Sequence, residues 1–336
     1  SWLAMLMPLM VRRSRPGERH FVDLPPCNRL VCVEMRAAVK RICLILIFGI
    51  EPSLAVTILD PSDTAAVSES DYRALGNRFP AIGKVDTNVT LVGSGVLIGD
   101  RWVLTAGHAA PGFASSATFR IGGTTYNASR ILSHPDYSYS LGVRPHDLSL
   151  VELATPVSGI SPVSLWRFGS PSGILGEEAV WVGTGLGGTG LAGQQASAGA
   201  AKRGFTNVID YSGRFGLPAT SIIADFDRPD GSENANNESS PDPTVLEGNV
   251  ASGDSGGGVF IERGGESYLA GIISYRAGLD GTADSDYGDL SGATNLALYY
   301  DWITEVTGIV PVPEPSGAWL LVVGVIQGLR RRSRPC

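Results

Sequence analysis

The alternation of apolar and polar residues along the chain predicts many short β-strands and few helices. A strand pattern begins at Ile82, and apolar runs at residues 96–98 and 102–104, separated by a Gly-Asp turn, predict a hairpin that leads to His108. The stretch HDLSLVELATPV alternates after Asp147, and AVWVGTGL and YLAGIISY predict further strands. The pattern therefore favours an all-β chain.

The remaining pattern predicts one helix and one polar segment. NLALYYDWITEVTG has helical spacing, and it predicts a helix at about residues 295–307 that ends at Gly308. Residues 56–81 form a polar N-terminal segment, in which we expect residues 60–77 to be loose. The counts of 43 glycines and 21 prolines fit strands that are joined by tight turns.

Composition excludes several classes of protein. The 336 residues are 43% hydrophobic, which is enough to bury a large core, and the net charge of -7 excludes a diffuse basic surface for nucleic acid or anionic lipid. Cysteines occur at positions 27, 32, 43 and 336. The long region between the last two can therefore contain no disulfide, and no thiolate can act there as nucleophile or metal ligand.

The N-terminal part of the chain has the features of a targeting signal. Residues 35–55 begin at Met35 and combine basic residues, a short apolar run and a Ser-Leu-Ala site, which predicts a secretory signal peptide removed after Ala55. A buried core strand is the alternative interpretation. Residues 1–34 lack periodicity, and we interpret them as an over-extended gene start or a disordered segment.

Residues 311–336 contain a second signal. They join a Val-Pro-Glu-Pro motif, an apolar run at 318–326 and a cluster of arginines, and together these resemble the PEP-CTERM sorting tail of exported bacterial proteins. The resemblance implies processing by sorting machinery at the cell envelope and an exported protein, in the envelope or outside the cell. The apolar run is shorter than the ~20 residues that span a bilayer, so a plain C-terminal helix is the alternative.

The stretch ASGDSGGGVF crowds glycines around Ser255, as either a flexible linker or a nucleophile that needs exposed backbone N–H groups would. The apolar residues that follow at once favour the nucleophile. Its GxSxG spacing would suit an α/β-hydrolase, but that fold needs a histidine after the serine, and all four histidines precede it. The order His, Asp, Ser remains, with His108 and Asp147 as partners; we interpret His134, His146 and Asp136 as ordinary surface, core or turn residues.

Six motifs in order carry a family resemblance. LTAGHA at His108, HPDY at His134, HDLSLVEL at Asp147, GDSGGG at Ser255, GIISY and the late YYDWI are similar to the chymotrypsin/trypsin family of serine proteases. The resemblance covers about residues 82–308. It implies an all-β fold with two antiparallel six-stranded β-barrels, at about residues 82–165 and 175–295, followed by the C-terminal helix.

The resemblance also implies roles for single residues. Ser255 would be the nucleophile, His108 the general base and Asp147 the residue that orients His108. The amides of Gly253 and Ser255 would form the oxyanion hole, and Ser274 would pair with the substrate backbone. The substrates would be polypeptides, and we expect no cofactor, no metal, no nucleic acid and a monomer.

Two further positions concern substrate specificity. Asn249, six residues before Ser255, stands at the family's base of the S1 pocket, and Arg276 stands where many members have a glycine. A neutral base and a nearby cation predict cleavage after small, apolar or acidic residues rather than after Lys or Arg.

The chain also departs from the family. It lacks the family disulfides and the usual Ile-Val-Gly-Gly start, so the partner of Asp254, a cation or hydrogen-bond donors, is left open. Residues 183–193 are glycine-rich, but we interpret them as a loop and not as a dinucleotide site. For the acidic stretch 225–242, with Asp225, Asp227, Asp230 and Glu233, a solvated surface insertion is favoured over a calcium site. A catalytically silent binding protein with the protease fold is the alternative function.

Overall fold

The computed structural model describes residues 56–90, 93–138, 144–167, 170, 172–196, 200–232 and 242–313. These residues belong to one compact unit of the chain, which spans Pro52–Cys336. The predicted signal peptide, the residues before it, Glu233 and nearly all of the predicted sorting tail lie outside the described residues. Among the described residues, no helix has the length and apolar content that a membrane crossing requires.

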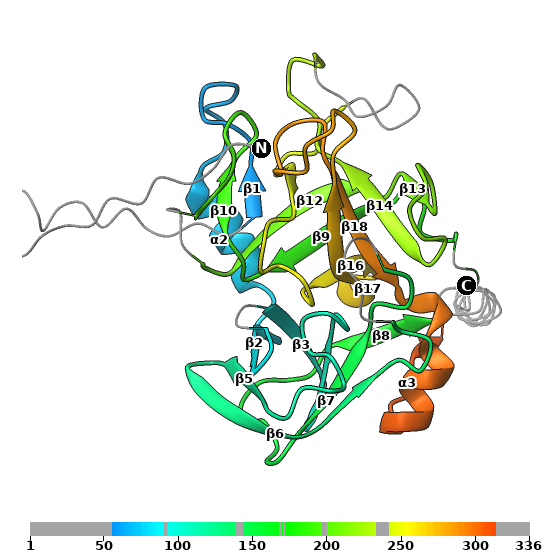
Figure 1. Cartoon of the computed structure of the whole chain (residues 1–336). Coiled ribbons are helices and arrows are strands. Elements are labelled where there is room, and N and C mark those ends of the chain that lie inside the picture. Colours follow the sequence, from blue (N-terminus) through cyan, green and yellow to red (C-terminus); the bar gives the residue numbers. More distant parts are fainter. Residues whose placement is uncertain are drawn as a thin grey trace, which may run out of the picture. The chain divides into compact units, whose positions relative to one another are not determined.

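The first half of the unit is a closed antiparallel barrel in the order β2-β3-β4-β7-β6-β5 (Figure 1). Alternate residues of its strands, such as Val85, Val103 and Phe119, fill its interior, which is the spacing that a strand with one buried face requires. Its strands are β2 (Ile82–Thr87), β3 (Gly93–Gly99), β4 (Trp102–Thr105), β5 (Ala117–Ile121), β6 (Thr124–Ser133) and β7 (Ser149–Leu153).

The second half is a curled sheet of nine strands, in the order β12-β9-β16-β17-β18-β14-β13, with β8 and β19 off this path. Trp181, Phe205 and Ile222 are among the fully buried side chains of its core. Its strands are β8 (Ser164–Arg167), β9 (Glu178–Gly183), β12 (Arg203–Val208), β13 (Tyr211–Ser212), β14 (Ser221–Asp225), β16 (Gly258–Arg263), β17 (Glu266–Ala277), β18 (Leu290–Asn295) and β19 (Val312–Pro313).

The predicted all-β fold of two barrels followed by a C-terminal helix is confirmed, with six strands in the first barrel and a half-barrel of nine strands in place of the second. In the described residues the first barrel closes through backbone pairing, whereas the second remains open between β12 and β13. The helix α3 (Tyr300–Thr307) follows a short 3₁₀ helix, η2 (Leu296–Leu298), so the first turn of the predicted helix has the tighter form. Gly308 ends α3 in the left-handed conformation, with φ of 74°.

The N-terminal segment is more ordered than its polar sequence predicts. Residues 56–58 form the strand β1 (Val56–Ile58), which joins β10 (Gly187–Thr189), β11 (Gly193–Gln195) and β15 (Gly248–Asn249) in a small sheet. Residues expected to be loose include the helix α2 (Glu69–Asn77). Tertiary contacts hold this helix, because the Tyr72 hydroxyl donates to the Glu247 carbonyl at 2.9 Å and Glu69 pairs with the fully buried Arg203.

Candidate active site

His108 and Asp147 meet because two neighbouring strands bring them to the same edge of the first barrel. β4 pairs antiparallel with β7, with Thr105 opposite Ser149, so the residues just after β4 lie beside those just before β7. His108 Nδ1 lies 2.7 Å from Asp147 Oδ2, and the His108 amide donates to Asp147 Oδ1 at 2.9 Å. The carboxylate therefore fixes both the ring and the backbone of His108.

The Asp147 carboxylate is buried yet ionised. Burial by itself raises the pKa of Asp147, but the hydrogen bonds and charge of His108 and a hydrogen bond from the Ser274 hydroxyl outweigh it and hold the pKa below its usual value. The Ser274 bond is 2.5 Å long. Gly107 makes room for this arrangement, since a Cβ there would lie 3.1 Å from Asp147 Oδ1 and 3.0 Å from the Tyr137 ring.

The loop around Ser255 exposes two backbone N–H groups. The amides of Ser252, Asp254 and Gly256 donate to acceptors within the protein. Among the hydrogen bonds of the described residues, the amides of Gly253 and Ser255 donate to none. Gly253 and Gly256 have φ of 94° and 88°, which explains why glycines stand on both sides of the Asp-Ser pair. The predicted oxyanion donors are therefore available to a ligand.

Ser94, on β3 of the first barrel, holds this loop from the opposite half of the unit. Its hydroxyl donates to the Gly253 carbonyl at 2.9 Å, and its amide donates to the Ser255 carbonyl at 2.7 Å. The same hydroxyl accepts from the Thr184 amide at 3.0 Å. Sequence reasoning did not identify Ser94, although a polar residue between two glycines in a buried strand is a signal that could have pointed to it.

Asp254 faces away from the cavity and is satisfied by backbone donors. Its carboxylate accepts from the Gly185 amide at 2.7 Å and from the Ala251 amide at 2.8 Å. Burial raises the pKa of Asp254 to about 7, although these amides and the charges of Arg203 and Arg276 oppose the rise. The sequence left open whether a cation or hydrogen-bond donors would be the partner of Asp254, and both act on its carboxylate.

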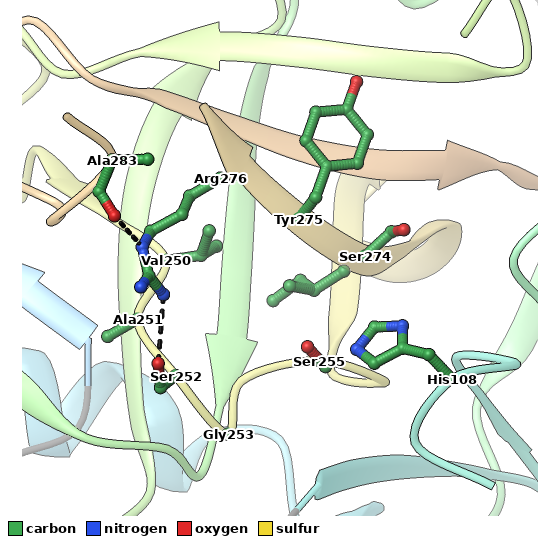
Figure 2. A pocket seen from close by; sticks show the side chains of 11 residues that line it. His108, Val250, Ala251, Ser252, Gly253, Ser255, Ser274, Tyr275, Arg276 and Ala283 are labelled. Carbon is green, nitrogen blue, oxygen red and sulfur yellow. Dashed lines mark hydrogen bonds between the residues drawn. The ribbon is translucent and has the colours of Figure 1, made fainter. Parts of the chain in front are cut away.

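A cavity of about 410 Å³ collects most of the predicted site residues (Figure 2). His108, Ser255 and Ser274 line one end of it, and Gly253 lies on the loop between Ser252 and Ser255. Ser274 lies where the pairing of β17 with β18 skips a residue, between Ile273 and Tyr275, so it has no partner on β18. This leaves the strand irregular at the point where a substrate backbone was expected to pair.

Arg276 reaches across the other end of the cavity. Its Nη1 donates to the Ser252 hydroxyl at 3.0 Å, and its Nε donates to the Ala283 carbonyl (Figure 2). Burial lowers the pKa of Arg276, and the carboxylates of Asp289, Asp284 and Asp254 oppose this change. The Arg276 side chain therefore leans into the cavity.

Asn249 does not line the cavity with these residues. It is fully buried, and its Oδ1 accepts from the Val250 amide at 2.8 Å and from the Ser291 hydroxyl. Asn249 lies on β15, and hydrogen bonds within the fold keep its side chain away from the described cavity wall, so it does not form the base of this cavity.

Two histidines that the sequence left as ordinary residues form a second polar cluster. The His134 and His146 rings lie 5.4 Å apart, and Asp136 lies beside His134. Burial and the neighbouring His146 lower the pKa of His134, whereas Asp136 opposes the change. His146 has a φ of 56°, an uncommon value for a residue that is not glycine, and it directly precedes Asp147.

The acidic stretch after β14 is not a wholly solvated insertion, as the sequence suggested. Asp225 and Asp227 are 1% and 4% exposed, because β14 carries this part of the chain into the core. Burial, followed by the nearby carboxylates of Asp225, Asp210 and Asp242, raises the pKa of Asp227 to about 8. Within the described ranges, none of the clusters of metal-ligand type includes Asp225, Asp227 or Asp230.

Comparisons with known proteins find similarity in sequence and in fold. A family model described as Trypsin matches residues 70–303. Achelase-1 of Lonomia achelous is 32% identical over 127 residues, which are 35% of this chain and 59% of that protein. The chain thus spans less than two thirds of that relative's length.

Two solved structures are similar in fold. One is neuropsin, described as a serine protease expressed in the limbic system of mouse brain, with 19% identity and a TM-score of 0.51 over 68% of this chain and 94% of that one. The other is HL collagenase, with 21% identity and a TM-score of 0.51 over 69% of this chain and 94% of that one. At these identities the two structures support the fold alone.

Proposed function

Because the chain belongs to the trypsin family, we propose that it is a serine endopeptidase that cleaves polypeptides through an acyl-enzyme intermediate. The observation that carries the proposal is the double hydrogen bond between His108 and the buried Asp147, at the end of the cavity that Ser255 also lines. Free amides at Gly253 and Ser255 support the same chemistry. No residue of this set requires a cofactor.

The first half of the reaction forms the acyl-enzyme. Because Nδ1 of His108 faces Asp147, Nε2 is the nitrogen that accepts the proton of Ser255 Oγ as this oxygen attacks the substrate carbonyl carbon. The carbonyl electron pair moves to its oxygen, and the amides of Gly253 and Ser255 stabilise the resulting oxyanion. Collapse re-forms the carbonyl and breaks the C–N bond, and Nε2 delivers the proton to the leaving amine.

Water completes the cycle by the same route. His108 accepts a proton from water, the hydroxide oxygen attacks the ester carbonyl, and the second oxyanion collapses to release the carboxylic acid. The proton returns to Ser255 Oγ. Asp147 remains ionised throughout and stabilises the imidazolium, which is consistent with the hydrogen bonds that keep its pKa low.

The cavity also supports the predicted choice of substrate. Apart from His108, Arg276 is the only residue of ionic type that lines the cavity within the described part of the chain. A lysine or arginine side chain before the scissile bond would meet this cation and be buried without a counter-charge, which is unfavourable by several kcal/mol. The proposed substrates therefore carry a small, apolar or acidic residue at P1, and the guanidinium of Arg276 would pair with an acidic one.

Export is part of the proposal and rests on sequence alone. The signal peptide at residues 35–55 and the PEP-CTERM-like tail at 311–336 support secretion and retention at the cell envelope. The mature protein would then begin at Val56, which is fully buried in β1. Mass spectrometry of envelope fractions should find this N-terminus; an intact 35–55 segment on cytoplasmic protein would refute the export step.

Hydrolysis of labelled casein tests the proposed activity. We expect the purified protein to cleave casein near neutral pH and Ser255→Ala to be inactive, with exposed Ser129→Ala as the matched control that retains activity. A peptide library with varied P1 residues then tests specificity, and Arg276→Ala should relieve the exclusion of Lys and Arg. If the wild type and Ser255→Ala are equally inactive against casein and the library, the alternative function, a silent binding protein, is favoured.

A further inference from the structure

The cluster of His134, Asp136 and His146 has the donor set of a transition-metal site. One ligand atom from each residue lies within 4.8 Å of the others. The set lies outside the cavity that His108 and Ser255 line. Two imidazoles and one carboxylate are borderline ligands, which suit Zn²⁺, Cu²⁺ or Ni²⁺ better than Ca²⁺ or Mg²⁺.

The spacing of the two rings is close to what such a metal needs. At a Zn–N distance of about 2.0–2.1 Å and tetrahedral angles, the centroids of two bound imidazoles lie about 5 Å apart. The ring centroids of His134 and His146 are 5.4 Å apart, and the rings are stacked with 11° between their planes. Because the rings are stacked, both must turn to direct one nitrogen of each at a common point, and the turn of His146 carries its backbone with it.

Neighbouring groups already orient the ligands. Tyr299 hydroxyl lies 3.0 Å from His146 Nδ1, which leaves Nε2 of that ring for a metal, as in zinc sites where the second nitrogen is hydrogen-bonded. The edges of Tyr299 and Trp302 pack against His134 at 5.0 Å, and these contacts hold that ring beside its partner. Asp136 is exposed and can move toward a bound ion.

We propose that His134, Asp136 and His146 bind one divalent transition-metal ion of the Zn²⁺ class, and that the bound ion lowers activity by displacing Asp147. The effect on activity rests on the proposed peptidase function. His146 is joined directly to Asp147 and has a strained backbone, and the His134 amide donates to the Leu148 carbonyl at 2.9 Å, so the ligands lie on both sides of Asp147. Movement of His146 toward a metal shifts the carboxylate that holds His108.

Calorimetric titration with ZnCl₂ tests binding independently of activity. We expect Ser255→Ala protein, which cannot digest itself, to bind a single tight Zn²⁺, and addition of His134→Asn or His146→Asn to weaken that binding at least about tenfold. His108→Ala and Asp284→Asn are the matched controls, since one removes the catalytic imidazole and the other alters the Asp284, Asp286 and Asp289 cluster. Melting curves confirm that each variant is folded.

The outcomes separate metal binding from its effect on Asp147. The proposed metal site is wrong if the affinity for Zn²⁺ is unchanged in both His134→Asn and His146→Asn. It is also wrong if Zn²⁺ binding is lost only in His108→Ala or Asp284→Asn. In the active protein, saturating ZnCl₂ should lower kcat at least about fivefold in the wild type and have no effect in His146→Asn. Tight binding at the site with an unchanged kcat overturns the effect on Asp147, whereas an inactive protein that still binds Zn²⁺ contradicts only the peptidase proposal.

Discussion

Replacement of Ser94 by alanine removes the hydroxyl through which the first barrel holds the nucleophile loop. Ser94 is fully buried, and its hydroxyl serves two backbone groups, the Gly253 carbonyl at 2.9 Å and the Thr184 amide at 3.0 Å. The Ser94 amide, which holds the Ser255 carbonyl, is unaffected by the change. The variant therefore tests the side chain alone.

The size of the effect follows from the groups left without partners. A buried polar group that loses its hydrogen bond destabilises a protein by about 1–3 kcal/mol, so two such groups should lower the free energy of unfolding by about 2–6 kcal/mol. Loss of the hydrogen bond to the Gly253 carbonyl also destabilises the backbone orientation in which the Gly253 amide faces the oxyanion. Because each 1.4 kcal/mol corresponds to about a factor of ten in rate, we expect kcat to fall about 5- to 100-fold.

Steady-state kinetics and urea unfolding measure the two effects separately. The change should appear mainly in kcat, because the oxyanion forms only after binding, and KM should change less than about threefold. Thr206→Val is the control, since its hydroxyl also bonds neighbours, Thr244 Oγ1 at 2.8 Å among them, but lies on β12. A Ser94→Ala protein with reduced stability and unchanged kcat would refute this role for Ser94.

Three further predictions follow from the same structure. Asp227→Asn should flatten the pH dependence of stability, because the pKa of Asp227 is about 8 in the folded state and 3.8 ordinarily, so the folded state retains a proton that the unfolded state loses. The free energy of unfolding of the wild type should therefore fall by about 1.4 kcal/mol per pH unit between these values. Urea unfolding of both proteins would detect the difference, and exposed Asp230→Asn would not reproduce it. Gly185→Ala should lower kcat about 100-fold, since its Cβ would lie 2.4 Å from the Ser252 carbonyl oxygen and displace the oxyanion loop; unchanged kinetics would contradict this. Ser274→Ala should lower the free energy of unfolding by about 1.5–3 kcal/mol at neutral pH. The difference from the wild type should shrink as acid protonates Asp147, because the low pKa of Asp147 stabilises the folded state only at pH values above that pKa.

The strands beside His108 and Asp147 were accessible from sequence because local patterns determine them, whereas the pairing of these two residues was expected from the family resemblance. Alternation after Asp147 identified β7, and the turn before Trp102 identified the hairpin that ends near His108. Antiparallel pairing of β4 with β7 then brings the two residues together. Short-range periodicity was sufficient for the strands, and the family resemblance supplied the expectation that the two residues at their ends would pair.

Contacts between distant segments were not accessible. The bond from Ser94 to Gly253 joins residues 159 positions apart, and the bond from Ser274 to Asp147 joins residues 127 apart. The helix α2 looked loose because its own sequence is polar, and the groups that stabilise it, Arg203 and the Glu247 carbonyl, lie far along the chain. Burial of Asp227 was hidden for the same reason.

Covalent labelling with a fluorophosphonate tests the central claim, that His108 and Asp147 activate Ser255 as a nucleophile. Intact mass spectrometry of the treated wild type, with peptide mapping, should show a single adduct on Ser255. The adduct should be absent in Ser255→Ala and should form at least about 100-fold more slowly in His108→Ala, because the serine then loses its general base. An unlabelled, folded wild type, or labelling of Ser255 at the same rate without His108, would contradict the account.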